Sequence, residues 1–266
     1  MKIIKCQGGL GNQLFGLAFA HTVATLTGER TGLDTASFAQ YRYGHRFALS
    51  DLAAALSLEV VSTPVRAHRL VGAAMRRSPL LQFGSDHAPP RSLKALRHLA
   101  ERHQYFDGYW QSEAFFADRD LIRSRVRDHM RPAGAAPIAY DVVVHYRTYA
   151  DEFRPERRGV PGVGYVRRAL ANLAAEGAPI SGIALVSDDP ARARLQLGEL
   201  AFPMVVHPEG SPLADLALML QARSLILTNS SFSWWGGYCS EADRIIYPLR
   251  SNMFHYPAPA RRFRCL

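Results

Sequence analysis

Cysteine is scarce in this chain, and its cysteines lie far apart in the sequence. Only three occur among 266 residues, and no two of them form a CxxC pair: Cys6, Cys239 and Cys265. So few scattered cysteines exclude a disulfide framework, and the missing CxxC pair argues against a structural zinc site. The sequence therefore predicts a reduced protein of the cytoplasm.

Long apolar runs and several catalytic signatures are missing as well. No stretch approaches the roughly 20 apolar residues of a membrane span, and Met1–Lys5 leads directly into glycines without the apolar run of a signal peptide. The chain has no GxSxG elbow, no HExxH helix and no glycine loop followed by Lys-Ser or Lys-Thr. These absences argue against a serine hydrolase, a zinc protease and a P-loop nucleotide hydrolase.

Acidic residues are outnumbered by basic ones. The 32 Lys and Arg residues against 23 Asp and Glu give a formal net charge of +9, which predicts an anionic partner. Arginine is concentrated in residues 66–103, where few aromatic side chains accompany it. Because nucleic-acid sites combine basic and stacking aromatic residues, we expect no nucleic-acid partner. The segment suits peripheral contact with an acidic membrane surface, and a solvated arginine face is the simpler alternative.

Strand and helix patterns alternate along most of the chain. A strand over 1–6 precedes a glycine turn and a helix over 14–25, and after a proline-rich linker at 130–137 the alternation restarts. There we expect strands over 140–145, 182–187, 204–206, 225–228 and 244–248, and helices over 164–176, 190–200, 212–221 and 234–240. Apolar strands alternating with helices predict parallel sheets covered on both faces. We expect two Rossmann-like lobes, 1–131 and 138–248, and a C-terminal tail over 249–266.

Four polar clusters follow predicted strands, at the edge where open parallel sheets bind ligands. In the first, Gly8–Gln13, glycines allow close backbone approach and amides at the helix start favour anions, although a tight turn explains the glycines equally well. In the second, His145 and Arg147 alternate onto one side of a strand end, where arginine can hold a phosphate through two hydrogen bonds.

The other two clusters precede helices. Ser187-Asp188-Asp189 offers carboxylates to a ribose or a base edge, and N-capping before Pro190 is the alternative that explains one aspartate. The segment from Thr228 to Gly236 brings hydroxyls and amides to a strand–helix junction, which is typical of an anion cradle. Its aromatic residues form a wall for a ligand or, for at least one tryptophan, part of the core.

Taken together, the clusters resemble glycosyltransferase family 11, the bacterial α-1,2-fucosyltransferases, and more distantly other transferases that use GDP-fucose. The matching segments run in family order: GGLGNQLF at 8–15, DGYWQSEAFF at 107–116, HYR at 145–147, SDD at 187–189 and DLALMLQARSLILTNSSFSWWGGY at 215–238. The resemblance implies an α/β GT-B fold, two Rossmann-like lobes with the donor site in the cleft. It also implies inversion at the sugar carbon, with no cofactor and no metal.

The resemblance further implies a reaction and a set of contacts. L-Fucose would pass from GDP-fucose to the 2-hydroxyl of a galactose-like acceptor, a lipid-linked glycan or a surface polysaccharide, with the enzyme peripheral on the inner membrane. Arg147 would act in catalysis by stabilising the leaving GDP. The implied substrate-binding residues are Gly9, Gly11, Asn12, His145, Arg147, Ser187, Asp188, Asp189, Asn229, Ser230, Ser231 and Phe232.

One segment departs from the family pattern. Where the family reads HxRRGD, this chain reads HYRTYAD at 145–151, so Thr148 replaces the second arginine and the acid is displaced to Asp151. Arg154, Arg157 and Arg158 are candidates to supply the missing cation. Asp151 is our candidate catalytic base, and a dissociative reaction with a weak base or water is the alternative. The departure also leaves open another GDP-sugar, another acceptor hydroxyl, or binding without turnover.

Overall fold

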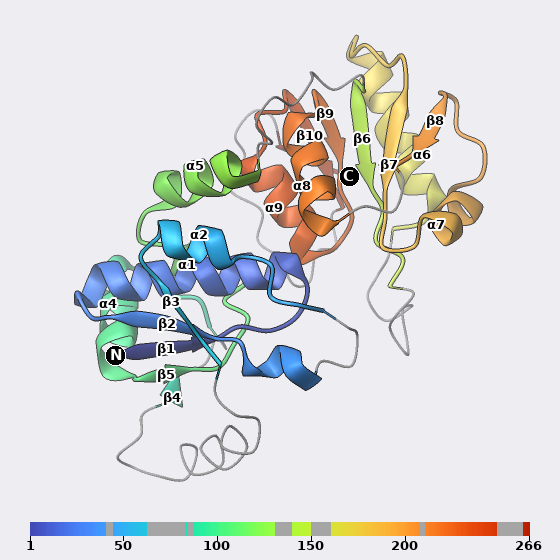
Figure 1. Ribbon diagram of the computed structural model, residues 1–266. Helices are drawn as coiled ribbons and strands as arrows, with labels where there is room; N and C mark the ends of the chain where they lie inside the picture. The colour runs from blue at the N-terminus through green and yellow to red at the C-terminus, as the bar shows by residue number, and fades with distance from the viewer. Residues whose placement is uncertain are drawn as a thin grey trace. The chain divides into compact units, whose positions relative to one another are not determined.

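Two compact units make up the part of the chain that the structure describes. The computed structural model describes residues 1–40, 45–62, 83–84, 88–130, 140–149, 161–207, 211–248 and 263–266. The units are Met1–Arg125 and Val126–Leu266, and each is built on its own parallel sheet (Figure 1). This confirms an α/β fold of two Rossmann-like lobes, the architecture of the GT-B class. No helix in the described ranges is long and apolar enough to cross a membrane.

The first unit holds a five-stranded sheet in the order β3-β2-β1-β5-β4. Every strand pair is parallel: β1 (Lys2–Lys5), β2 (Thr31–Asp34), β3 (Glu59–Val61), β4 (Phe83–Gly84) and β5 (Tyr105–Phe106). The helical segments are α1 (Leu10–Thr27), η1 (Ala36–Gln40), α2 (Ser50–Ala55), α4 (Leu93–Arg102), η2 (Glu113–Phe115) and α5 (Arg119–Met130), the last of which ends in the second unit.

Helix α1 is the central helix of the first unit. It begins four residues before the segment expected from the sequence, so that Gly11 and Asn12 lie in its first turn. Phe19, fully buried, stacks on Trp110 with ring centroids 4.0 Å apart, and Phe106 and Phe115 pack edge-on against Phe19. Burial of these aromatic rings fastens the helix to the segment that follows β5.

The second unit holds a six-stranded sheet in the order β11-β10-β9-β6-β7-β8. All of its strand pairs are parallel: β6 (Val142–His145), β7 (Ile183–Val186), β8 (Met204–Val206), β9 (Ser224–Ile226), β10 (Arg244–Tyr247) and β11 (Phe263–Cys265). Numbered from β6, this is the strand order 3-2-1-4-5-6 of dinucleotide-binding folds. The helices are α6 (Val163–Ala175), α7 (Pro190–Leu197), α8 (Pro212–Gln221) and α9 (Ser231–Cys239).

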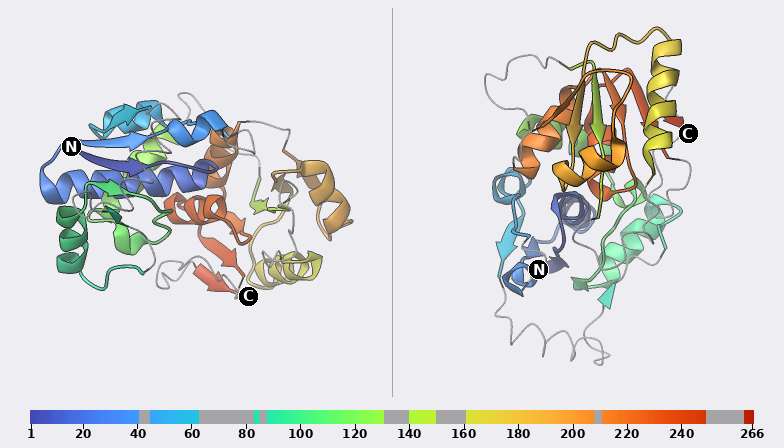
Figure 2. Two further views of the ribbon diagram at one scale, coloured as in Figure 1. Left: turned by 90° about the horizontal axis from the view of Figure 1, so that it is seen from below. Right: turned by 90° about the vertical axis from the view of Figure 1, so that its right-hand side faces the viewer.

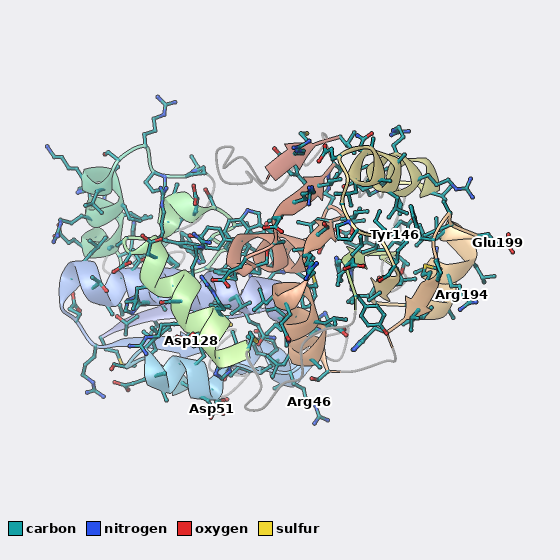
Figure 3. The ribbon with its side chains drawn as sticks, turned by 90° about the horizontal axis from the view of Figure 1, so that it is seen from above. Arg46, Asp51, Asp128, Tyr146, Arg194 and Glu199 are labelled. Atoms are coloured by element: carbon teal, nitrogen blue, oxygen red, sulfur yellow. The ribbon has the colours of Figure 1, made fainter. Side chains whose placement is uncertain are left out.

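Helices cover both faces of the second sheet. Val142 and Val144 of β6 join one apolar cluster with residues of α6 and α7, and Val143 joins another with residues of α8. Figure 2 shows α6 and α8 on opposite faces of the sheet. Successive strand residues point to opposite faces, which is why the first three residues of this strand are all valine. Arg194 and Glu199 lie at the exposed periphery of the unit (Figure 3).

Several elements differ from the sequence expectations. The strand over 244–248 was expected to be the last, but β11 follows it and pairs with β10. A three-residue strand carries too little pattern to be distinguished from a loop, and it is defined by its pairing. Helix α9 begins at Ser231 rather than at 234, because Ser230 caps it. Of the linker expected over 130–137, Met130 instead ends α5, and residues 131–137 lie outside the described residues. So do residues 66–82 and 85–87 of the basic segment over 66–103.

Candidate functional site

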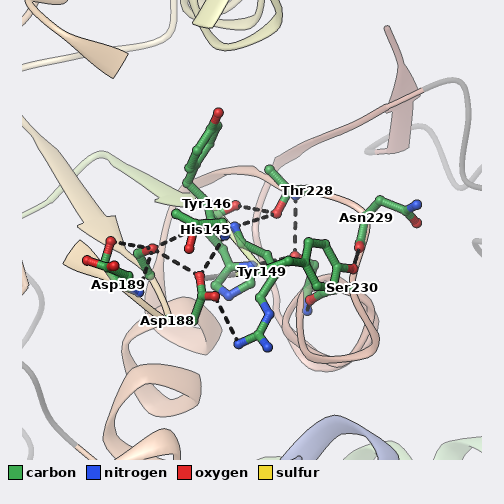
Figure 4. Close-up of polar contacts among 12 residues, drawn as sticks. His145, Tyr146, Tyr149, Asp188, Asp189, Thr228, Asn229 and Ser230 are labelled. Carbon is green, nitrogen blue, oxygen red and sulfur yellow. Dashed lines mark hydrogen bonds and ion pairs between the residues drawn. The ribbon is translucent and has the colours of Figure 1, made fainter. Parts of the chain in front are cut away.

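Three of the predicted clusters meet at the carboxyl ends of β9, β6 and β7, which are neighbours in the sheet. The chain turns in opposite directions after β6 and after β9, so this is the topological switch point at which such sheets bind ligands. Thr228, just beyond β9, joins the chain there to the end of β6 (Figure 4). Its hydroxyl donates to the His145 carbonyl and accepts the Arg147 N–H, both at 3.0 Å.

The N-terminus of α9 lies at this edge. Ser230 caps the helix by accepting the Ser233 N–H at 3.0 Å. In the described part of the chain, no acceptor is paired with the N–H groups of Ser231 and Phe232 in the first turn. These amides and the helix dipole favour an anion. Trp234 and Trp235 are fully buried in the core.

His145 is a buried, neutral residue. Its side chain is only 3% exposed, and its Nδ1 lies 2.5 Å from the Ser233 hydroxyl oxygen. Burial lowers the pKa of His145 to about 3, with Arg147 adding to the effect and Asp188 opposing it. The ring of Phe232 lies 5.1 Å from the imidazole. His145 therefore contributes an uncharged ring to the site at neutral pH.

Arg147 supplies the positive charge of the site. Its Nη1 lies 3.3 Å from Asp188 Oδ2, and the two side chains are 23% and 10% exposed. Asp188 Oδ1 also accepts the Thr148 N–H at 2.6 Å. Burial acts to raise the pKa of Asp188, but Arg147 and Thr148 outweigh it, so the pKa is lowered. The ion pair thus stays charged at neutral pH and fixes one edge of the guanidinium.

The two adjacent aspartates do different work. Asp189 caps α7, since its carboxylate accepts the Arg192 N–H at 2.9 Å and Pro190 opens the helix. Asp188 instead faces Arg147. The Ser187 hydroxyl donates to the Tyr146 carbonyl at 2.7 Å and holds this turn against the end of β6. N-capping therefore accounts for Asp189, whereas Asp188 forms the ion pair with Arg147.

The glycine turn and the 107–116 segment meet in the first unit, after the carboxyl ends of β1 and β5, which are neighbours in the sheet. Gln111 donates from its Nε2 to Asn12 Oδ1 at 2.8 Å. Gln13 is structural, because its buried amide binds the Gly8 and Arg46 carbonyls and the Ala48 N–H. Trp110 lies in the core, whereas Tyr109 is 39% exposed.

Substitution of Gly8 tests how tightly the glycine turn is packed against the Asn12 side chain. Its φ is +83°, and a β-carbon there would lie 2.6 Å from Asn12 Nδ2. Gly28 has a φ of +69° but nothing within 4 Å of such a carbon. We expect Gly8→Ala to lower the free energy of unfolding by about 2 kcal/mol and the control Gly28→Ala by about 1 kcal/mol. Chemical denaturation measures both, and equal losses would mean that Asn12 gives way freely.

The structure brings most of the predicted site residues together in the second unit. These are His145, Arg147, Ser187, Asp188, Asp189, Asn229, Ser230, Ser231 and Phe232, whereas Gly9, Gly11 and Asn12 belong to the first unit. Asp151 and the arginines at 154, 157 and 158 lie outside the described residues. The predicted cluster from Thr228 to Gly236 contains the bridging Thr228, two residues after β9, and Ser233, the partner of the Ser230 cap, but sequence reasoning singled out neither as a site residue. Over the described ranges, no group of three or more His, Cys, Asp or Glu is gathered as a metal site.

Comparison with known families identifies the class of the protein. The profile described as "Glycosyl transferase family 11" matches residues 82–253, more than half of the chain. The match contains four of the five quoted segments, and the glycine turn at 8–15 lies before it. The chain therefore belongs to glycosyltransferase family 11, as the motifs predicted. No curated protein sequence matches the chain.

Solved structures of fucosyltransferases are similar over most of the chain. The NodZ α-1,6-fucosyltransferase soaked with GDP-fucose has a TM-score of 0.49 and 16% identity, covering 96% of this chain and 97% of that one. The fucosyltransferase NodZ from Bradyrhizobium gives 0.48 and 14%, covering 92% and 94%. POFUT1 in complex with GDP gives 0.46 and 13%, covering 92% and 97%. At these values the likeness carries no argument about substrate.

Proposed function

We propose that this chain is an inverting fucosyltransferase that moves L-fucose from GDP-fucose to the 2-hydroxyl of a galactose-like acceptor in a surface glycan. Membership of glycosyltransferase family 11 supports the reaction class. The observation that carries the proposal is the place of Arg147, at the switch point of a nucleotide-binding sheet and paired with Asp188. A cation there suits the diphosphate of a sugar nucleotide.

The chemistry follows from where charge develops. The acceptor oxygen forms a bond to the fucose anomeric carbon while the bond from that carbon to the β-phosphate oxygen breaks, and GDP leaves. Negative charge grows on the β-phosphate, where fixed donors stabilise the transition state more than the ground state. We assign this role to the Arg147 guanidinium and to the amides of Ser231 and Phe232. Gly9, Gly11 and Asn12 are the substrate contacts that we propose for the first unit.

Guanosine recognition is assigned to the turn Ser187-Asp188-Asp189. Each carboxylate already accepts hydrogen bonds from the protein, Asp188 from Thr148 and Asp189 from Arg192. An ionised carboxylate has about four lone-pair sites, so both can still accept N–H groups of guanine. In this proposal Asp188 both orients Arg147 through the ion pair and accepts a hydrogen bond from the guanine base. Recognition of the base is thereby coupled to the position of the cation that binds the phosphates.

The acceptor proton needs a destination. We propose Asp151 as the catalytic base, because Asp151 and Glu152 are the acidic residues nearest to Arg147 in the sequence. Both lie outside the described residues. The alternative is a dissociative reaction, in which an oxocarbenium-like fucose needs only water as the proton acceptor. A solvent isotope effect on turnover near unity for both the wild type and Asp151→Asn would favour the dissociative alternative.

A panel of donors and acceptors tests the proposed function. We expect turnover with GDP-fucose well above that with GDP-mannose, an unchanged rate in EDTA, and transfer to a galactoside but not to its 2-deoxy analogue. Equal rates with the two donors would remove the fucose assignment, and transfer to the 2-deoxy acceptor would remove the 2-hydroxyl. Loss of activity in EDTA that added Mg²⁺ restores would contradict the metal-independent mechanism.

Another GDP-sugar, or another acceptor hydroxyl, is the second candidate. Thr148 favours it, because this residue stands where the family pattern has a second arginine. Binding of GDP-fucose with no transfer or hydrolysis would instead indicate a non-catalytic nucleotide-sugar binder. A nucleic-acid-binding module is the least supported alternative, and salt-sensitive DNA binding at micromolar affinity would revive it.

We further propose that the protein acts in the cytoplasm, peripherally on the inner membrane, where a lipid-linked acceptor would be presented. The supporting feature is α4, on which Lys94, Arg97 and Arg102 are exposed beside a 58% exposed Leu93. Basic residues beside an apolar one suit an anionic lipid surface. Flotation with anionic liposomes tests this, and protein that stays at the bottom of the gradient would remove the membrane contact.

A further inference from the structure

Tyr149 adopts a backbone conformation that bulky residues rarely adopt. Its φ is +52°, in the left-handed region, and its side chain is only 8% exposed. Glycine is the residue that takes such a φ without steric cost, whereas a β-carbon makes it unfavourable. A tyrosine kept there indicates that its side chain makes contacts that offset the strain.

Two contacts hold the Tyr149 side chain. Its hydroxyl donates a hydrogen bond to the Asn229 carbonyl, in the turn that leads into α9 (Figure 4). Its ring lies 5.1 Å from the Cζ atom of Arg147, within the distance of a cation–π contact. One side chain thus joins the guanidinium to the turn whose amides face the expected phosphates.

The ring restrains Arg147 in a way that Asp188 does not. Asp188 holds Nη1 at 3.3 Å, but its negative charge also offsets the attraction of Arg147 for an anion. The tyrosine ring carries no net charge, so it orients the guanidinium while leaving the positive charge available. An arginine oriented before the ligand arrives loses less side-chain entropy on binding.

We propose that Tyr149 is a positioning residue that holds the Arg147 guanidinium in register with the Asn229–Ser231 turn for binding of a nucleoside diphosphate. This inference rests on the proposed function, since it takes the GDP diphosphate as the ligand of Arg147. It assigns Tyr149 no contact with substrate. Its effect is exerted through Arg147 and therefore depends on that side chain.

The test compares GDP with guanosine, which lacks the phosphates, by titration calorimetry. Tyr149→Leu keeps an apolar side chain but removes the ring face and the hydroxyl, whereas Tyr149→Phe keeps the ring. We expect Tyr149→Leu to weaken GDP binding by about tenfold and guanosine binding by less than about twofold. The Phe variant keeps the ring against Arg147 but loses the hydrogen bond to the Asn229 carbonyl, so its GDP affinity should lie between those of the wild type and Tyr149→Leu. In an Arg147→Ala background, Tyr149→Leu should cost nothing further, because its effect passes through Arg147.

An NMR measurement and the binding measurements together distinguish failure of this inference from failure of the proposed function. The Nε–H resonance of Arg147 reports the ring contact without any ligand, and we expect its ring-current shift in the wild type and its loss in Tyr149→Leu. If the shift is present but the wild type does not bind GDP, the proposed function fails, and with it the assigned ligand. If GDP binds and Arg147→Ala weakens it, but Tyr149→Leu leaves it unchanged or weakens guanosine equally, the positioning role is wrong.

Discussion

Replacement of Arg147 by alanine is expected to weaken GDP binding by roughly 10- to 100-fold and to slow GDP-fucose turnover by about 100-fold or more. The guanidinium is the charged donor at the switch point, and the Asp188 carboxylate beside it would be left without its cation. An uncompensated, largely buried carboxylate repels a diphosphate, so the variant loses an attraction and gains a repulsion. The effect on turnover exceeds that on binding, because charge grows on the β-phosphate in the transition state.

Two further variants make the Arg147 experiment specific. Arg194→Ala removes the same charge from an exposed position on α7 of the same unit, and we expect GDP affinity and turnover to be unchanged (Figure 3). Arg147→Lys keeps the charge but loses the planar fork, and it should restore only part of the affinity. Calorimetry and a GDP-release assay measure all three. Equal losses in the Arg147 and Arg194 variants would reduce the effect to net charge and remove the site assignment.

Acid is expected to destabilise the second unit through His145. The pKa of this ring in the folded state is about 3, against 6.5 for an ordinary histidine. Above pH 6.5 the ring is neutral in both states, so its stabilising contribution is fully present there. Below pH 6.5 the unfolded chain takes up a proton that the folded ring does not, so the free energy of unfolding falls by about 1.4 kcal/mol for each pH unit. This loss continues until the pH approaches the folded pKa.

Denaturant titrations of the wild type and His145→Asn between pH 7 and pH 4 test this linkage. Asparagine has no ionisation in this range, and its amide can still bind the Ser233 hydroxyl. His21 and His103 also have lowered pKa values caused by burial, but they are present in both proteins and cancel in the difference. We expect the free energy of unfolding of the wild type to fall with decreasing pH more steeply than that of His145→Asn. The difference in slope should reach up to about 1.4 kcal/mol per pH unit, which corresponds to the uptake of one proton. Parallel curves would show that the folded protein accommodates a charged ring at position 145.

Much of the second unit was predictable because its sequence repeats one physical pattern. The valine run of β6 marks a strand buried on both faces, and Ser211-Pro212 and Asp189-Pro190 mark helix starts. The helix over 212–221 and the strand over 204–206 were placed at their observed bounds. The first unit was harder, since β4 and β5 have two residues each and are defined by their neighbours in the sheet.

The site was predictable in its clusters but not in its contacts. Spacing placed the turns after β6, β7 and β9 at one edge, and the family pattern singled out Arg147. The Arg147–Asp188 pair and the Thr228 bridge depend on β6 lying between β7 and β9, which no local pattern encodes. The left-handed φ of Tyr149 was equally hidden, because tyrosine is an improbable residue for that conformation.

The placement of the tryptophans gives the protein a built-in optical reporter. The chain holds three tryptophans, of which Trp234 and Trp235 directly follow the first turn of α9 and Trp110 lies in the core of the other unit. Indole emission responds to nearby charge, so a nucleotide at the N-terminus of α9 would perturb the emission of Trp234 and Trp235. Occupancy of the proposed donor site would therefore be readable without a label, and a Trp110→Phe variant would leave only the α9 signal.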